Sequence, residues 1–165
     1  MIVPDAALLL AGFVLAHAAW SVSDVAELLV PLAIVERSGK RELVRVEATT
    51  QEEAVSKGKA LYPDWTKTTD AWAFGREGLM PQGNGKVDVF VVDFWAKGMG
   101  SPVTILQRFE PFEKKQHFKI IGDPQVVIDG AIQDSNQVGF MVSRIQEGVA
   151  QHPKAGALWK TWRVE

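Results

Sequence analysis

Cysteine is absent from this 165-residue sequence, so disulfide bridges, thiol catalysis and cysteine-ligated zinc or iron–sulfur sites are all excluded. An excess of positive charge is also missing, because 18 basic residues face 20 acidic ones and give a net charge of −2. Proteins that bind nucleic acid mainly through its phosphates are usually clearly basic, so we expect no nucleic-acid partner. The three histidines do not lie at the spacing of a helical metal-binding motif. The sequence therefore predicts a protein without a metal or another cofactor.

Recognisable catalytic motifs are missing as well. No Gly-x-Ser-x-Gly nucleophile elbow occurs in the sequence. The glycine pairs at 83/85 and 98/100 lack the spacing of a phosphate-binding loop, and hairpin turns explain both of them. An apolar fraction of 47% with 23% charged residues is typical of a soluble globular chain, and the length fits a single domain over residues 1–165.

Residues 4–20 form the segment that the sequence assigns least clearly, because it could be a buried helix or a targeting segment. Their apolar run is about 15 residues long, shorter than the roughly 20 needed to cross a membrane. Asp5 precedes this run and no Lys or Arg does, which is the wrong charge pattern for a secretory signal. We predict a buried helix, in a cytoplasmic protein without a membrane partner. Ala16-His17-Ala18 imitates a signal-peptidase site, so an exported or membrane-tethered protein is the alternative.

A long apolar hairpin at residues 86–112 is the strongest structural signal in the sequence. Residues 87–96 are apolar on both alternating faces, which indicates a central strand covered on both sides. A glycine-rich connection at 97–102 leads into a second apolar strand over 103–109. We expect the first and the last helix of the chain to cover this hairpin.

Shorter patterns complete the predicted architecture. The elements in chain order are a helix (4–20), two strands (28–35, 41–47), a helix (51–61), four strands (69–80, 87–96, 103–109, 117–121) and a helix (136–151). This order, α-β-β-α-β-β-β-β-α, has only short connections between strands. It predicts an α+β fold: a mostly antiparallel sheet of about six strands with helices packed on it.

Several residues mark the expected ends of these helices. Thr50 and Glu53 form a capping box that opens the second helix, and Pro63 is expected to end it. Asp134 is the predicted N-cap of the last helix. His152 follows that helix, and a position at a helix C-terminus favours a protonated histidine.

Asp93 is the residue of the central strand that core packing does not explain. An unpaired carboxylate among apolar neighbours is costly, so Asp93 needs a partner or must face a cleft. One interpretation is a structural ion pair with an arginine, for which the sequence offers Arg76, Arg108 and Arg144. The other is an acid/base carboxylate with a raised pKa, assisted by His17 or Glu77. The three candidate catalytic residues are therefore Asp93, His17 and Glu77.

Tryptophan is abundant, with six residues in this short chain. Tryptophans pack cores and also line ligand pockets and interfaces. We expect Trp72 and Trp95 in the core, with the alternative that they and Arg76 bind a ligand. The strand over 69–80 also carries small residues, Ala73 and Gly75, which let a helix or a ligand approach the sheet closely.

Two hypotheses about function remain open. The first is a non-catalytic binding module that holds a partner protein, a second copy of itself or a small apolar ligand against one face of the sheet. The second is a small cofactor-free enzyme with Asp93 in a cleft between sheet and helices. An Asp93 that lines a pocket favours the enzyme, whereas an Asp93 sealed in an ion pair favours the binding module.

Overall fold

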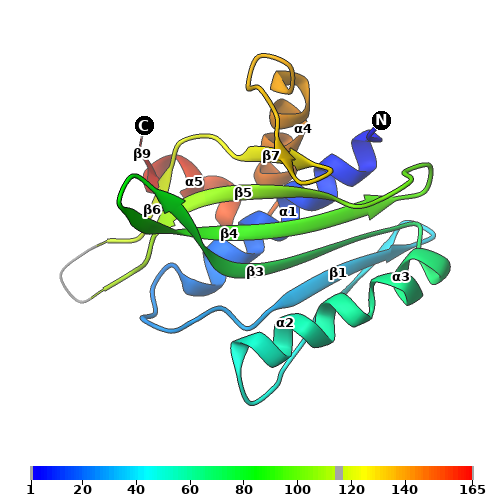
Figure 1. Ribbon diagram of the computed structural model, residues 1–165, viewed down its shortest axis with the longest axis horizontal. Helices are drawn as coiled ribbons and strands as arrows, with labels where there is room; N and C mark the ends of the chain where they lie inside the picture. The colour runs from blue at the N-terminus through cyan, green and yellow to red at the C-terminus, as the bar shows by residue number, and fades with distance from the viewer. Residues whose placement is uncertain (1, 114–116, 165) are drawn as a thin grey trace.

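A curled, mostly antiparallel sheet organises the chain, which confirms the α+β fold expected from the sequence (Figure 1). The computed structural model describes residues 2–113 and 117–164. Its strands are β1 (Leu32–Arg37), β2 (Lys40–Arg45), β3 (Ala71–Gln82), β4 (Gly85–Ala96), β5 (Val103–Glu110), β6 (Lys119–Ile121), β7 (Gln125–Ile128), β8 (Ala131–Ile132) and β9 (Arg163–Val164). Its helices are α1 (Asp5–Val22), α2 (Gln51–Ala60), α3 (Tyr62–Thr68), α4 (Gly139–Ala150) and α5 (Ala155–Trp162).

The strands lie in the order β2-β1-β3-β4-β5-β6-β9, with β7 attached to β5 and β8 to β7. Among the described residues the β6–β9 pair is parallel and the other pairs are antiparallel. The apolar strand β4 lies between β3 and β5, which confirms its predicted central position. The sheet has nine strands instead of about six because short pieces, such as the two-residue β8 and β9, join its edge.

Helix α1 covers one face of the central strands. Small side chains on β3 allow this, since a Cβ on Gly75 would lie only 3.0 Å from Cγ1 of Val14. The predicted close approach to the small residues of this strand is therefore made by a helix. In length and composition α1 could also cross a membrane, but 61% of its residues are buried inside the protein. Its apolar character is used for packing within the fold.

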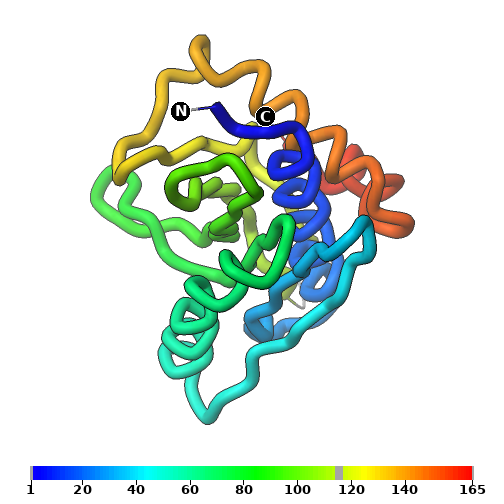
Figure 2. Tube along the Cα trace, turned by 90° about the vertical axis from the view of Figure 1, so that its right-hand side faces the viewer, coloured from blue at the N-terminus to red at the C-terminus, as the bar shows by residue number. Residues whose placement is uncertain are grey.

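Helix α4 packs on the outer side of α1, with α5 beside it (Figure 2). The last long helix was expected to cover the central hairpin, but it packs on α1 instead of on the sheet. Glycines set this contact. A Cβ on Gly12 would lie 1.9 Å from the carbonyl oxygen of Ile145, and one on Gly148 would lie 2.1 Å from that of Leu9. The two helix backbones therefore touch directly at both places.

Helices α2 and α3 lie on the opposite face, over β1 and β3 (Figure 1). Gly58 of α2 lies against the ring of Phe74, and the ring of Tyr62 of α3 packs on that of Trp72, with 4.3 Å between centroids and a tilt of 32°. The predicted cap of α2 is confirmed, because the hydroxyl of Thr50 accepts a hydrogen bond from the Glu53 amide at 3.2 Å. Helix α2 ends at Ala60, before Pro63, as expected. A new helix that was not expected follows at once, and Pro63 lies in the first turn of α3, where its missing N–H has no intrahelical acceptor to lose.

The start of the last long helix also differs from the prediction. Helix α4 begins at Gly139, and the side chain of Asp134 instead accepts a hydrogen bond from the Asn136 amide at 2.8 Å. This local turn competes with a helical start, as short polar side chains commonly do.

Candidate functional site

Asp93 lies in a cluster of three donors at the junction of α3, β3, β4 and β5. Its Oδ2 accepts from Nη1 of Arg76 at 2.8 Å and from the hydroxyl of Tyr62 at 2.5 Å. Its Oδ1 accepts from the hydroxyl of Thr104 at 2.5 Å. The Asp93 and Arg76 side chains are only 10% and 13% exposed. Arg76 is thus the partner, one of the three arginines that the sequence offered.

The electrostatics of this cluster do not suit an acid/base catalyst. Burial alone would raise the pKa of Asp93, but Arg76 and the hydroxyls of Thr104 and Tyr62 together hold it below its ordinary value. Burial and the charge of Asp93 raise the pKa of Tyr62. Asp93 is therefore a very weak base, and it does not line any of the cavities described below. The acid/base hypothesis stays a prediction that this geometry does not support.

The other candidate residues are not brought to Asp93. His17 belongs to α1 on the opposite face of the sheet, and its Nδ1 lies 3.1 Å from Nε2 of His152. Glu77 also points to that face, because neighbouring residues of a strand alternate, and its Oε2 accepts from the Leu29 amide at 2.9 Å. Trp72 is fully buried, and Nε1 of Trp95 donates to the carbonyl of Met99 at 2.9 Å. Both tryptophans belong to the core.

A groove opens where β3 extends beyond the end of its neighbour β1. The last pair between these strands is Leu32 with Gly75, and β3 continues to Gln82. The groove has a volume of about 510 Å³. Its lining comes from three places: the segment before β1, the first turns of α2 and the projecting part of the β3–β4 hairpin. We call it the edge groove. Its apolar members are Leu28, Val55, Gly78 and Leu79, and its polar ones are Gln51, Glu52, Arg76, Glu77 and Asp88.

The backbone of β3 is unpaired along this groove. The Lys97 amide donates to the carbonyl of Asp70, which fixes the alternation of the β3–β4 ladder. Because the β3–β4 register continues without a bulge to Gln82, the amides and carbonyls of Glu77 and Leu79 point away from β4. In the described part of the chain no strand pairs with β3 beyond Gly75 on that edge.

Negative charge gathers around the same opening. A second hollow of about 210 Å³ shares Leu28, Glu77 and Asp88 with the edge groove and adds Glu27 and Glu113. Burial and the nearby charge of Asp88 raise the pKa of Glu77, even though the Leu29 amide opposes this. Burial and the charge of Glu113 likewise raise the pKa of Asp88. No described lysine or arginine forms an ion pair with these carboxylates.

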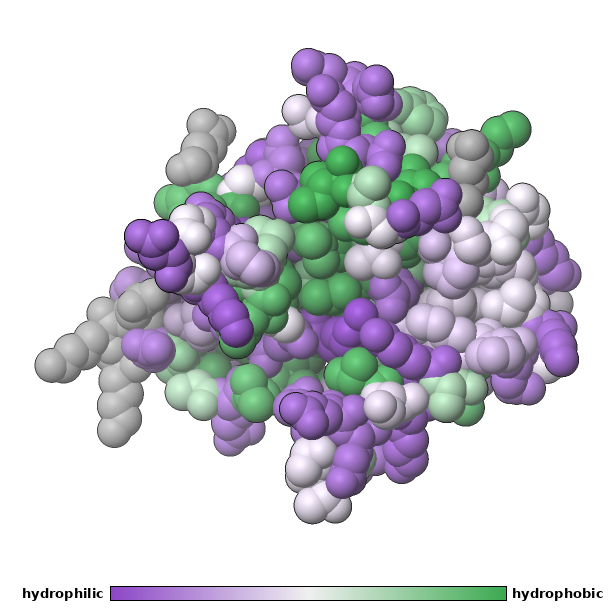
Figure 3. All heavy atoms as spheres, in the orientation of Figure 1, coloured by the Kyte–Doolittle hydropathy of each residue, from purple (hydrophilic) through white to green (hydrophobic). Residues whose placement is uncertain are grey.

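Apolar side chains are exposed beside this charge. Leu28 is 66% and Leu79 is 64% exposed. Arg76 then links the groove to the face of the sheet that α2 and α3 leave uncovered, since Arg76 pairs with Val91 and Val91 with Leu106. Figure 3 shows apolar side chains gathered over β4, β5 and β7 in the middle of that face. The surface thus combines a strand edge without a partner in the described chain, exposed apolar area, and carboxylates that form no ion pair with a described residue.

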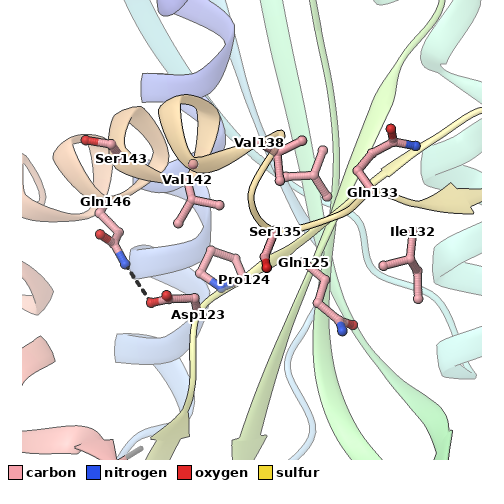
Figure 4. A pocket seen from close by; sticks show the side chains of 12 residues that line it. Asp123, Pro124, Gln125, Ile132, Gln133, Ser135, Val138, Val142, Ser143 and Gln146 are labelled. Carbon is pink, nitrogen blue, oxygen red and sulfur yellow. Dashed lines mark hydrogen bonds between the residues drawn. The ribbon is translucent and has the colours of Figure 1, made fainter.

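A further cavity of about 480 Å³ lies between the β7–β8 hairpin and α4 (Figure 4). Its one carboxylate, Asp123, is already bound, because it accepts from Nε2 of Gln146 at 3.0 Å and from Arg163. The remaining polar groups there are neutral amides and hydroxyls such as those of Gln125 and Ser135. Across residues 2–113 and 117–164, no group of three or more metal-ligating side chains comes together.

Searches against protein-family models, curated proteins and solved structures found no match to this chain. The edge groove joins two of the candidate site residues, Arg76 and Glu77, in one opening. Asp93 belongs to it indirectly, because it holds the guanidinium of Arg76. Asp88 also stands out in the sequence as a charge in an apolar strand, but its place beside a turn predicts only a solvated residue. No sequence signal marked Leu28 or Leu79, whose place in the groove depends on where β1 begins relative to β3.

Proposed function

We propose that this protein is a non-catalytic binding module that holds a basic, extended segment of a partner protein in the edge groove. One observation carries the proposal: β3 runs unpaired past β1, beside an apolar groove with an acidic rim. The function rests on three kinds of contact, made by the backbone of β3, by its apolar neighbours and by the carboxylates.

The unpaired backbone favours an extended peptide as the ligand. A peptide that adds a strand to a free sheet edge gains main-chain hydrogen bonds, and its alternate side chains enter the adjoining pockets. The groove-facing groups of Glu77 and Leu79 supply the edge for such pairing. Pro81 lacks an N–H and limits the pairing near the hairpin turn. A short segment of about four to five residues matches this length of strand.

The charge favours a basic segment. Glu52, Glu77 and Asp88 line the groove, and Arg76 cannot neutralise them because its guanidinium is bound to Asp93. A lysine or arginine has an aliphatic stem that suits Leu28 and Leu79, and a cationic end that suits the carboxylates. The same charge disfavours nucleic acid. It also disfavours two copies of this chain pairing through the same edge, since like charges would then face each other.

Capped hexapeptides test the proposal directly by titration calorimetry. A peptide that alternates valine with lysine is expected to bind with a Kd on the order of 10–100 µM, whereas its valine–glutamate counterpart does not bind. Methylating alternate backbone nitrogens of the basic peptide, on its pairing edge, is expected to abolish binding because the main-chain donors are lost. Equal binding of the basic and acidic peptides would refute the charge argument.

Matched variants locate the site. Replacing Glu77 by Gln together with Asp88 by Asn is expected to weaken the basic peptide about tenfold, since two charges are removed while Gln can still accept from the Leu29 amide. Glu147→Gln on α4 removes a charge far from the groove and serves as the control. If this control weakens the peptide as much as the double variant does, the edge groove is not the binding site.

A further inference from the structure

A second pocket lies on other elements, away from the edge groove. It is bounded by α1, the β1–β2 hairpin and the turn between α4 and α5, and its volume is about 360 Å³. This is within the range of small-molecule pockets. We call it the histidine pocket, because the rings of His17 and His152 form part of its wall.

Aromatic rings form the body of the histidine pocket. The ring of His152 lies 5.0 Å from that of Phe13 and 6.0 Å from that of Trp20, between centroids, and the rings are tilted at 42° to each other in both pairs. His17 lies 5.7 Å from Trp20. Leu43, which is 41% exposed, stands at the opening. A flat apolar group can therefore contact several ring faces at once.

Both histidine rings are neutral in this arrangement. The amides of Lys154 and Ala155 donate to Nδ1 of His152 at 3.2 and 3.0 Å, so this nitrogen carries no proton. The proton of a neutral His152 is then on Nε2, which faces Nδ1 of His17. His17 accepts that bond, so its own proton is on Nε2. Neither ring supplies a positive charge to the pocket.

Positive charge comes instead from two side chains at the rim. The guanidinium of Arg41 lies 4.9 Å from the ring centroid of Phe13, and Nζ of Lys154 lies 5.1 Å from that of Trp20. Nε of Arg41 also bonds to Glu36 at 3.0 Å, so part of its charge is compensated. Lys154 forms no ion pair with any described residue, and no carboxylate lines the pocket. The rim therefore has uncompensated positive charge over an apolar interior.

We propose that the histidine pocket binds a small organic carboxylate with an aromatic body. The ring of such a ligand lies among Phe13, Trp20 and the two neutral histidines, and its carboxylate faces Lys154 and Arg41. A neutral apolar molecule would leave the cations unused, and an inorganic anion would leave the rings uncovered. Amphiphilic cations are disfavoured by the rim, which distinguishes this pocket from the edge groove.

Phenylacetate, phenylacetamide and phenethylamine are suitable probes, because they share the ring and differ in charge. Ligand-detected NMR and calorimetry on the full chain should show phenylacetate binding with a Kd on the order of 1 mM or tighter, at least about fivefold tighter than phenylacetamide. Phenethylamine is expected not to bind in this pocket. Equal affinity for the acid and the amide, or no binding of phenylacetate at about 10 mM, would overturn the proposal.

Two variants test the location without touching the core. Lys154→Glu reverses the free charge and is expected to weaken phenylacetate about tenfold or more, whereas Lys59→Glu on α2 makes the same charge change elsewhere and should have no effect. Leu43→Trp fills the opening from an exposed strand position and is expected to abolish binding. Circular dichroism of each variant checks that it is folded. Unchanged binding in a folded Leu43→Trp variant, or an equal loss in both lysine variants, would refute the site.

Discussion

Nε2 of His152 lies 3.1 Å from Nδ1 of His17, although the two residues are 135 positions apart in the chain. Two backbone amides at the start of α5 fix the tautomer of His152, and through it that of His17. The sequence analysis expected a protonated His152 at a helix C-terminus, and this was wrong. Nδ1 of His152 instead accepts from the amides of Lys154 and Ala155 at the start of α5, and a proton on this nitrogen would break both hydrogen bonds.

The first prediction concerns pH and stability. Burial lowers the pKa of both histidines. Repulsion from His152, were it protonated as well, and from Arg45 adds to the effect on His17, and the charge of Lys154 adds to the effect on His152. The unfolded chain therefore binds protons at a higher pH than the folded one. The stabilisation is complete above the ordinary histidine value of 6.5 and is lost as the pH falls below it. Urea unfolding between about pH 8 and pH 5.5 should show the unfolding free energy falling by up to ~1.4 kcal/mol per pH unit for each histidine.

A single substitution separates this effect from other titrations. In His152→Asn the amide oxygen replaces Nδ1 as an acceptor for the α5 amides, but the side chain no longer titrates. The slope of unfolding free energy against pH should become shallower in this variant. An unchanged slope would mean that the histidine pair does not cause the loss of stability in acid.

The second prediction concerns the Arg76–Asp93 pair. Asp93→Ala leaves a nearly buried guanidinium without its partner, and we expect a loss of about 3–5 kcal/mol in unfolding free energy. Replacing both residues, as in Asp93→Ala with Arg76→Met, removes the stranded charge and should restore a large part of that loss. Denaturant unfolding of the two single variants and the double variant gives the coupling energy. Additive effects would show that the ion pair is not the source of the cost.

The third prediction tests the contact between α1 and α4. Gly148→Ala brings a methyl group to 2.1 Å from the carbonyl oxygen of Leu9, so the helices must separate. We expect a loss of about 1–3 kcal/mol, although alanine is the better helix former. Gly139→Ala in the same helix meets no atom within 4 Å and should be neutral or stabilising by up to about 1 kcal/mol. Thermal and urea unfolding of both variants compare the two sites, and equal effects would contradict the predicted contact.

The fourth prediction concerns the pH dependence of peptide binding in the edge groove. The pKa values of Glu77 and Asp88 are raised, so these carboxylates lose their charge at a higher pH than ordinary ones. The affinity for the basic hexapeptide should therefore decrease as the pH falls from 7 towards about 5, and it should also decrease with added salt. Calorimetric titrations at several pH values measure this. A constant affinity over that range would show that the two carboxylates do not contact the peptide.

Much of the fold could be predicted because it depends on local patterns. The alternation of residues 87–96 placed β4 in the centre of the sheet, and the capping box opened α2 where expected. Asp134 was misplaced as a helix cap, because an aspartate forms turns as well as caps. The start of α3 at Pro63 was missed, because a proline fits the start of a helix as well as a position after its end. Contacts with distant parts of the chain set these helix boundaries, and the local sequence does not show them.

The α+β class, the central strand and the need of Asp93 for a partner all follow from the sequence, because burial patterns and the cost of an unpaired charge are local properties. The choice of Arg76 as the partner of Asp93, and the contact between His17 and His152, depend on how distant parts of the chain pack together. The same holds for the extension of β3 beyond the end of β1, which creates the edge groove. These features depend on strand register and helix placement, and packing over the whole chain sets both.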